Sequence, residues 1–278
     1  MNKAKLYFDT SSLINFISTD HILPDQIKIN YDVFLSLLNY FEIIVYEDNS
    51  KRIYLLDYIE AFKDHLPLDL PTSIIERFLS DYSTNKNQTR WSIDGHNYPE
   101  WNDANNIKVI REYLKKEKEH FKATNTRARI FIENNKMNTN NPTIQDSLLY
   151  LNYIFSQNNI LEGIFEGISC IQPKLNFPTL EKIELMKSLP LICFFVPWLF
   201  GHHRLAMKNS YFSPKKNPNS IDVAHSFYMG ACDVFITDDK RLHSLLDDLN
   251  KFKFFNFYKQ VKILDSSQLI NSLIKSAH

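Results

Sequence analysis

Apolar and polar positions follow two kinds of pattern along this chain. Strands are predicted where short apolar runs are bounded by polar residues, at 5–8, 42–46, 234–237 and 261–264. Helices are predicted where apolar residues recur at helical spacing, at 12–17, 31–40, 51–62, 72–82, 106–122, 144–157, 178–189, 221–229 and 240–249. Strands therefore cluster at the two ends of the chain, and the middle is mostly helical.

This order of elements predicts an α/β fold with a Rossmann-like parallel sheet in an α/β/α sandwich. Strands that are apolar throughout are typical of parallel sheets, which are buried on both faces. We expect residues 1–82 and 203–278 to form one discontinuous core, with 83–202 as a large, mostly helical insertion packed on it. The polar stretch 83–106 and the basic, proline-bearing stretch 201–219 are predicted to be loops.

Composition narrows the class of protein. The chain has 278 residues, 44% of them hydrophobic and 14% aromatic, which argues against disorder. Only 5 glycines are present and no Gly-rich phosphate loop is found, which disfavours P-loop ATPases and dinucleotide-binding enzymes. Acidic and basic residues balance at 32 each, so any binding of nucleic acid has to come from a local patch.

Cysteine usage and hydropathy suggest a cytoplasmic protein. Cys170, Cys193 and Cys232 are odd in number, widely spaced and set among apolar residues, which predicts buried reduced thiols. The N-terminus lacks the pattern of a signal peptide. The longest apolar run, 189–200, is broken by prolines and is too short to span a bilayer, so no membrane association is expected.

Three acidic residues lie at the ends of predicted elements. Asp9 follows the first strand, Asp222 lies near the start of the helix at 221–229, and Asp239 follows the strand at 234–237. The C-terminal ends of parallel strands line a crevice where the strand order reverses, so distant acids can meet there. Packed carboxylates repel one another, and Mg²⁺ or Mn²⁺ would offset that repulsion. The pattern predicts a metal site for phosphodiester hydrolysis, although each acid could instead cap a helix.

These motifs resemble those of PIN-domain nucleases, in a bacterial branch of PIN-like proteins. The resemblance covers the two ends of the chain and rests on Asp9-Thr10-Ser11-Ser12-Leu13-Ile14, on Asp222-x-x-His225 and on Thr237-Asp238-Asp239. It implies a metal-dependent nuclease that usually acts on RNA, with Asp9, Asp222 and Asp239 as metal ligands. It also implies that the Thr237 hydroxyl orients Asp9 by a hydrogen bond.

The resemblance implies a further acid, on the helix after the second strand. With that strand placed at 42–46, the candidate helix is 51–62, and Asp57 is preferred because it interrupts an apolar run. Asp57 could instead be an ordinary, partly exposed helix residue without a role in the site. Glu60, Glu76 and Glu47 are weaker candidates.

The remaining polar residues near these motifs have two interpretations each. His225 could contact a phosphate, the leaving group or a metal, or it could be a structural partner of Asp222. Asp233 is expected to cap a turn, and Asp238 is excluded because the family leaves that position variable.

Two basic segments could contact phosphates, although a solvated surface is the alternative for both. The first leads to Asp222 and carries Tyr211 and Phe212, which could stack on bases; its basic residues are His202, His203, Arg204, Lys208, Lys215 and Lys216. The second is interleaved with glutamates and comprises Lys108, Arg111, Lys115, Lys116, Lys118, Lys122, Arg127 and Arg129.

The sequence therefore predicts a Mg²⁺- or Mn²⁺-dependent endoribonuclease. A role as a toxin with an antitoxin partner, or as a defence nuclease, follows from the resemblance alone, and a homodimer is left open. Two alternatives stay open: a catalytically degenerate PIN-like protein that binds nucleic acid or regulates, and a nuclease directed at DNA.

Overall fold

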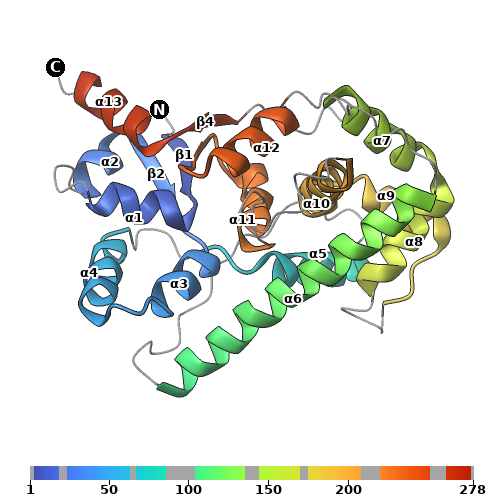
Figure 1. Cartoon of the computed structure of the whole chain (residues 1–278), viewed down its shortest axis with the longest axis horizontal. Helices are drawn as coiled ribbons and strands as arrows, with labels where there is room; N and C mark the ends of the chain where they lie inside the picture. The colour runs from blue at the N-terminus through green and yellow to red at the C-terminus, as the bar shows by residue number, and fades with distance from the viewer. Residues whose placement is uncertain are drawn as a thin grey trace.

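A four-stranded parallel sheet, built from both ends of the chain, organises the computed structural model (Figure 1). The structure describes residues 3–18, 24–62, 67–85, 104–134, 144–169, 175–207, 220–250 and 261–276. The strands are β1 (Ala4–Phe8), β2 (Tyr31–Phe34), β3 (Val234–Ile236) and β4 (Lys262–Leu264), in the order β2-β1-β3-β4. β1 pairs in parallel with β2 on one side and with β3 on the other. The predicted α/β class and parallel sheet are confirmed.

Helices make up most of the rest of the described chain. Before the long middle segment they are α1 (Thr10–Ser18), α2 (Pro24–Asn30), α3 (Leu37–Ile44), α4 (Asn49–Glu60) and α5 (Pro71–Thr84). The middle segment holds α6 (Ala104–Asn134), α7 (Ile144–Ser156), α8 (Asn158–Ser169), α9 (Thr179–Met186) and α10 (Leu189–Met207). The C-terminal part holds α11 (Ser220–His225), the 3₁₀ helix η2 (Ser226–Ala231), α12 (Lys240–Asn250) and α13 (Ser266–Ser276).

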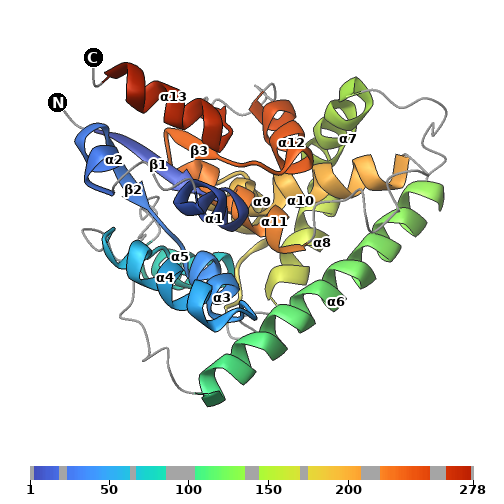
Figure 2. The same cartoon turned by 60° about the vertical axis from the view of Figure 1, so that its left-hand side comes forward.

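The sheet separates two hydrophobic clusters, because alternate residues of a strand point to opposite faces. Leu6, Tyr7 and Phe8 are all fully buried, as expected for a strand covered on both faces. Leu6 and Phe8 pack with α1, α4 and α13, whereas Tyr7 packs with α10, η2 and α12. Figure 2 shows helices on both sides of the strands.

The helices of the middle segment share the core of the sheet. Buried side chains of α7, α8, α9 and α10 belong to the same cluster as Tyr7 and Phe235 of the sheet.

Within the described residues, no single helix is long and apolar enough to cross a membrane. Helices α9 and the first part of α10 meet the length and hydropathy criteria only when taken together, and the pair is bent by 72°. Cys193 and Cys232 are buried free thiols, as predicted, and Cys170 lies outside the described residues.

The predictions for residues 31–46 were wrong. The segment 31–40 was expected to be a helix, but it holds strand β2 and the start of α3; residues 42–46, expected to be a strand, hold the end of α3. The adjacent apolar residues Val33 and Phe34 of the short strand and Leu37 and Leu38 of the following helix together mimic helical spacing. Ser36 starts α3 with a capping box that includes Asn39, and burial of Ile43 and Ile44 outweighs their preference for strands.

Other boundaries also differ from those expected. The charged helix runs to Asn134 rather than ending near 122, and α10 continues to Met207 through part of the predicted basic loop. Helices α2, α8 and α13 were not predicted. Residues 86–103 and 208–219, the remaining parts of the predicted loops, lie outside the described residues.

Candidate active site

The strand order reverses between β1 and β3, and the chain leaves both strands at the same edge of the sheet. Asp9 follows β1, and Thr237 follows β3. The backbone N–H of Asp9 donates to the carbonyl of Ile236 at 3.0 Å, which extends the strand pairing to the first acid. This is the position in open parallel sheets where crevices for ligands form.

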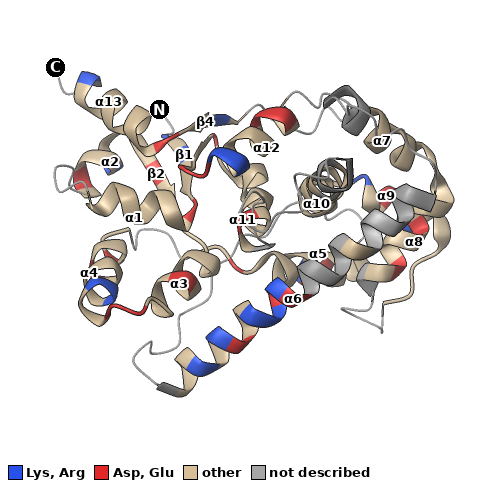
Figure 3. Cartoon of the chain, in the orientation of Figure 1, with Lys and Arg blue, Asp and Glu red and all other residues tan. Residues whose placement is uncertain are grey.

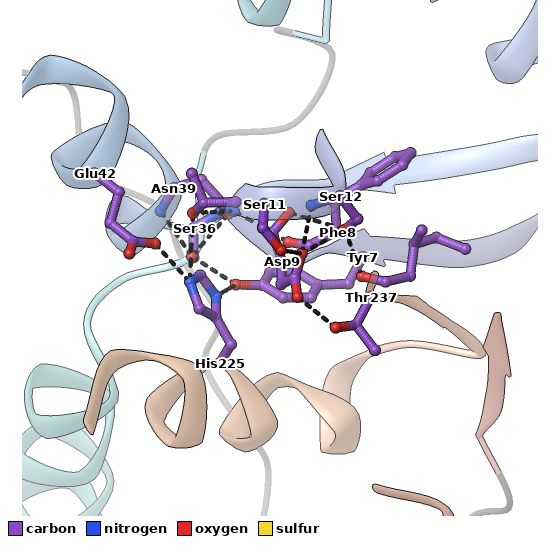
Figure 4. Close-up of polar contacts among 12 residues, drawn as sticks. Tyr7, Phe8, Asp9, Ser11, Ser12, Ser36, Asn39, Glu42, His225 and Thr237 are labelled. Atoms are coloured by element: carbon purple, nitrogen blue, oxygen red, sulfur yellow. Dashed lines mark hydrogen bonds and ion pairs between the residues drawn. The ribbon is translucent and has the colours of Figure 1, made fainter. Parts of the chain in front are cut away.

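The Asp9 carboxylate is buried and held by donors from both strands' ends. Its Oδ1 accepts from the Ser12 backbone N–H at 2.7 Å and from the hydroxyls of Ser12 and Ser11 at 2.5 and 3.1 Å. Its Oδ2 accepts from the Thr237 hydroxyl at 2.5 Å (Figure 4). Asp9 thus caps α1, and the expected hydrogen bond from Thr237 is present. Because hydrogen bonds to a charged group are strong, they fix the carboxylate in one orientation.

The second part of the site is a buried histidine with a partner on each ring nitrogen. His225, 1% exposed, lies 2.5 Å from the Tyr7 hydroxyl through Nδ1 and 3.0 Å from the Glu42 carboxylate through Nε2. Figure 4 shows the ring between these two side chains. Burial acts to lower the pKa of His225, but the hydrogen bond and charge of Glu42, with the charges of Asp9 and Asp222, raise it overall.

A protonated His225 gives every hydroxyl in this network an acceptor. Both ring nitrogens then donate, one to Glu42 and one to the Tyr7 oxygen, which leaves the Tyr7 hydroxyl to donate to Ser36 at 2.8 Å. The Ser36 hydroxyl donates in turn to the Asn39 amide oxygen at 2.9 Å. With a neutral His225, one of the contacts among His225, Tyr7, Ser36 and Asn39 would lack a proton, so we assign the charged form to His225.

Glu42 is the residue that the sequence analysis missed. It lies on α3, the helix that follows the true second strand, and its side chain is 24% exposed. Burial acts to raise the pKa of Glu42, but the hydrogen bond and charge of His225 and a hydrogen bond from Thr10 lower it overall. Because the second strand was predicted at 42–46, the further acid was expected on the helix at 51–62 rather than on α3.

The four candidates named for the further acid lie elsewhere. Asp57 and Glu47 are exposed, and Glu60 and Glu76 are half-buried on α4 and α5. Within the described residues, the hydrogen bonds of Asp9, Thr237 and His225 reach none of the four. The signal that could have identified Glu42 is the Ser36 capping motif, which marks the start of α3 just after the strand.

Asp239 forms the third part of the site, at the start of α12. Its backbone N–H donates to the Thr237 hydroxyl at 3.2 Å, so the same hydroxyl contacts Asp9 and the Asp239 backbone. Arg241 reaches both oxygens of the Asp239 carboxylate, at 3.1 Å from Nε and 2.9 Å from Nη2. Burial acts to raise the pKa of Asp239, and the hydrogen bonds and charge of Arg241 lower it overall.

Asp222 lies in the first turn of α11, half-buried, on the same helix as His225. Its charge raises the pKa of His225, and it also raises the pKa of Arg241 after the larger effect of Asp239. Electrostatic effects of this kind fall off with distance, so Asp222 lies within electrostatic range of both His225 and Arg241. The three acids predicted from the two chain ends therefore occupy one region of the structure.

Oxygen ligands of this kind suit Mg²⁺ or Mn²⁺, and the chemistry of the donor set fits such an ion. Asp9, Asp222 and Asp239 would hold it, with Glu42 nearby. Among the described side chains, no three His, Cys, Asp or Glu residues are already arranged as a metal-binding group. Both Asp239 oxygens contact Arg241, so metal binding would require Arg241 to give way.

The other residues considered from the sequence fall outside this cluster. Asp233 accepts from the Lys5 backbone N–H at 2.9 Å, at the opposite end of the sheet, and Asp238 accepts from Ser266 at 2.8 Å. His203 is buried and stacks on Tyr150 at 4.4 Å, which makes it a core residue. The rest of the first basic segment, with Tyr211 and Phe212, lies outside the described side chains.

Fold and site together define an α/β protein with acidic residues gathered at the switch point of a parallel sheet. Searches of family models, curated proteins and solved structures found nothing that matches this chain.

Proposed function

We propose that this chain is a divalent-metal-dependent nuclease that hydrolyses phosphodiester bonds, with RNA as its substrate. The observation that carries the proposal is the contact between Asp9 and Thr237. It joins residues 228 positions apart, the Asp239 backbone N–H donates to the same Thr237 hydroxyl, and Asp222 lies within electrostatic range of Arg241, the partner of Asp239. A structural cap for α1 needs only Asp9 and Ser12, so this gathering of acids exceeds what capping requires.

The resemblance to PIN-domain nucleases supports the same function. Its motifs include Asp9, Asp222, Thr237 and Asp239, and it implies a further acid on the helix after the second strand. We assign that position to Glu42, because α3 follows β2 and Glu42 contacts His225. A bound Mg²⁺ or Mn²⁺ would polarise the scissile phosphate and lower the pKa of a water molecule.

The chain's own residues would contribute orientation and charge. Thr237 and Ser12 fix the Asp9 carboxylate, which removes the cost of ordering it when substrate binds. His225 brings a buried positive charge next to the acids and holds Glu42 at the rim of the site. Because His225 is buried and bonded at both nitrogens, its role is to position Glu42 rather than to contact a phosphate.

The test is cleavage of labelled single-stranded RNA in Mn²⁺ by the Asp9→Asn and Asp239→Asn variants. We expect cleavage to fall by about a thousandfold or more in each, because loss of a group that acts on the reacting atoms costs several kcal/mol. Asp57→Asn is the matched control, since Asp57 is exposed on α4 and should leave the rate unchanged. Circular dichroism and thermal melting establish that the variants fold.

Calorimetric titration with Mn²⁺ gives a second readout that does not depend on activity. We expect wild type and Asp57→Asn to bind Mn²⁺ alike and Asp9→Asn to bind it at least about tenfold more weakly, because a carboxylate ligand is lost. Cleavage by folded Asp9→Asn at the wild-type rate would refute the proposal. The same assay with DNA of equal sequence separates an RNA-directed from a DNA-directed nuclease.

One observation favours a second function, a nucleic-acid-binding or regulatory protein without cleavage. Arg241 contacts both carboxylate oxygens of Asp239, as expected of a site whose cation has been replaced by an arginine. Arg241→Gln separates the two functions. A nuclease inhibited by this contact would bind Mn²⁺ more tightly in the variant, whereas a degenerate site would show no cleavage in either form.

A further inference from the structure

The N-terminal half of α6 carries a row of exposed cations along one side. Ile110 and Leu114 are buried against the core. Four exposed cations recur at helical spacing on one adjoining face, and we call them the basic stripe: Lys108, Arg111, Lys115 and Lys118. Glu112 and Glu119 each lie four residues after a cation of the stripe, Lys108 and Lys115, so they border it, whereas Lys116 lies farther round the helix. The exposed side of this part of α6 therefore carries more cations than carboxylates.

α6 crosses the two helices that carry site residues. Tyr113 packs edge-on against Phe41 of α3, with ring centroids 5.8 Å apart. Tyr113 and Glu117 also line one pocket with Ile221 and Ala224 of α11, next to Asp222. Figure 3 shows, in blue, the basic residues along the N-terminal part of α6, where the side chains are described. The basic stripe thus begins beside the candidate active site.

Charge connects the stripe to the site directly. Lys118 contributes to lowering the pKa of Glu42, in addition to the larger effects of burial and of His225, so its ammonium lies within electrostatic range of that carboxylate. All four cations of the stripe are exposed, so an anion from solution can reach them.

The stripe has the length that a polymer of phosphates requires. From Lys108 to Lys118 the helix rises about 15 Å, which is enough to follow several successive phosphates of a single strand. The whole chain has a formal net charge of zero, so a local surface of this kind is where a polyanion would bind.

We propose that the basic stripe of α6 binds the phosphate backbone of single-stranded RNA and leads it to the acids at the sheet edge. The choice of RNA rests on the proposed nuclease function, but the binding step requires neither metal nor cleavage. Phosphate contacts position a nucleic acid without reading its sequence, so we expect the stripe to set affinity and register rather than sequence preference.

The experiment compares two triple variants of equal charge change, each at exposed positions. The test variant is Arg111→Gln, Lys115→Gln and Lys118→Gln; the control variant is Lys116→Gln, Lys262→Gln and Lys275→Gln. Binding of a fluorescein-labelled single-stranded RNA is followed by anisotropy in EDTA, over a series of salt concentrations. EDTA removes divalent metal, so cleavage does not interfere.

We expect the test variant to bind RNA at least about tenfold more weakly than wild type at low salt. The slope of log affinity against log salt should become shallower by about 2, since each phosphate contact to a single strand contributes about 0.7. The control variant should keep both the affinity and the slope of wild type. Unchanged thermal melting shows that the fold is retained.

The two proposals fail in different ways. If the test variant binds RNA with the wild-type slope, or if both triple variants weaken binding equally, the stripe proposal is overturned even when wild type cleaves RNA in Mn²⁺. If the test variant alone loses binding while wild type cleaves nothing in Mn²⁺, the stripe proposal stands and the nuclease proposal fails.

Discussion

The two sides of the candidate site are held by different kinds of interaction. On the side of β1, Asp9 and His225 are 4% and 1% exposed, and their hydrogen bonds come from buried partners. On the side of α12, the Asp239 and Arg241 side chains are 17% and 39% exposed and bond mainly to each other. Folding therefore fixes the side of β1. The side of α12 is held by an ion pair, in which another cation could take the place of Arg241 or a phosphate the place of Asp239.

This difference has an energetic basis. A buried polar group that loses its partner keeps the full cost of desolvation, whereas an exposed ion pair regains water. The β1 side is therefore suited to holding a fixed geometry, and the α12 side is suited to changing partners. Substitutions on the two sides should have effects of different size on the free energy of unfolding.

The largest effect on stability is expected from His225→Ala. The substitution leaves the Glu42 carboxylate and the Tyr7 hydroxyl without their shared partner, and it opens space beside two buried tyrosine rings. We expect a loss of about 3 kcal/mol, at the lower end for a broken buried ion pair because Glu42 is partly exposed. Urea unfolding at neutral pH measures it.

His243→Ala provides the matched control for this substitution. His243 lies on α12, is 31% exposed and pairs with Asp247 four residues later. Its loss should cost less than about 1 kcal/mol, as for other exposed pairs. Equal losses for the two histidines would show that the β1 side is no more rigid than the α12 side.

A smaller, pH-dependent effect is expected from Glu42→Gln. The pKa of His225 is raised in the folded protein, so its pairing stabilises the fold below the ordinary histidine pKa of about 6.5, and this contribution is lost as the pH rises through the raised pKa. The pKa of Glu42 is lowered, so its contribution is present above about pH 4.3 and is lost as the pH falls through the lowered pKa.

The free-energy difference between wild type and Glu42→Gln should therefore be greatest at about pH 5 to 6.5, at about 1 to 2 kcal/mol, and smaller at about pH 9. Urea unfolding across this range measures it, with Glu47→Gln as control because Glu47 is exposed one turn beyond α3. A difference that grows with pH would contradict the assignment of a charged His225–Glu42 pair.

The smallest effect on stability is expected from Arg241→Gln, on the exposed side. Its ion pair with Asp239 is solvated, and Asp239 still accepts from the Arg241 backbone N–H at 2.7 Å and so keeps its role as a helix cap. We expect the free energy of unfolding to change by less than about 1 kcal/mol. A loss above about 2 kcal/mol in urea unfolding would mean that this side is as firmly fixed as the other.

The elements that the sequence predicted correctly are those whose signal is local and strong. The apolar run before Asp9 and the run before Thr237 are strands, and the helices predicted at 51–62 and 72–82 correspond to α4 and α5. The failure at 31–46 had a local cause, because β2 has only 4 residues and runs almost directly into a capped helix. Because of this one error, Asp57 rather than Glu42 was predicted to be the further acid.

Local pattern also could not rank the two basic segments or show which charges of α6 lie near the candidate site. The spacing of Lys108, Arg111, Lys115 and Lys118 was readable in the sequence, yet which side of α6 is buried depends on α3, α10 and α11. The sequence also left two roles open for His225, because its burial depends on packing against Tyr7 and Tyr228.

The sequence by itself determined the α/β class, the acids at strand and helix ends, and the chemistry that oxygen ligands favour, because these depend on neighbouring residues. The contact between Asp9 and Thr237 was expected from the sequence motifs, but tertiary structure alone decided that Glu42 meets His225, 183 residues away. The physical reason is that strand order and burial bring together segments that share no local signal, and the free energy of packing outweighs local preference wherever the two disagree.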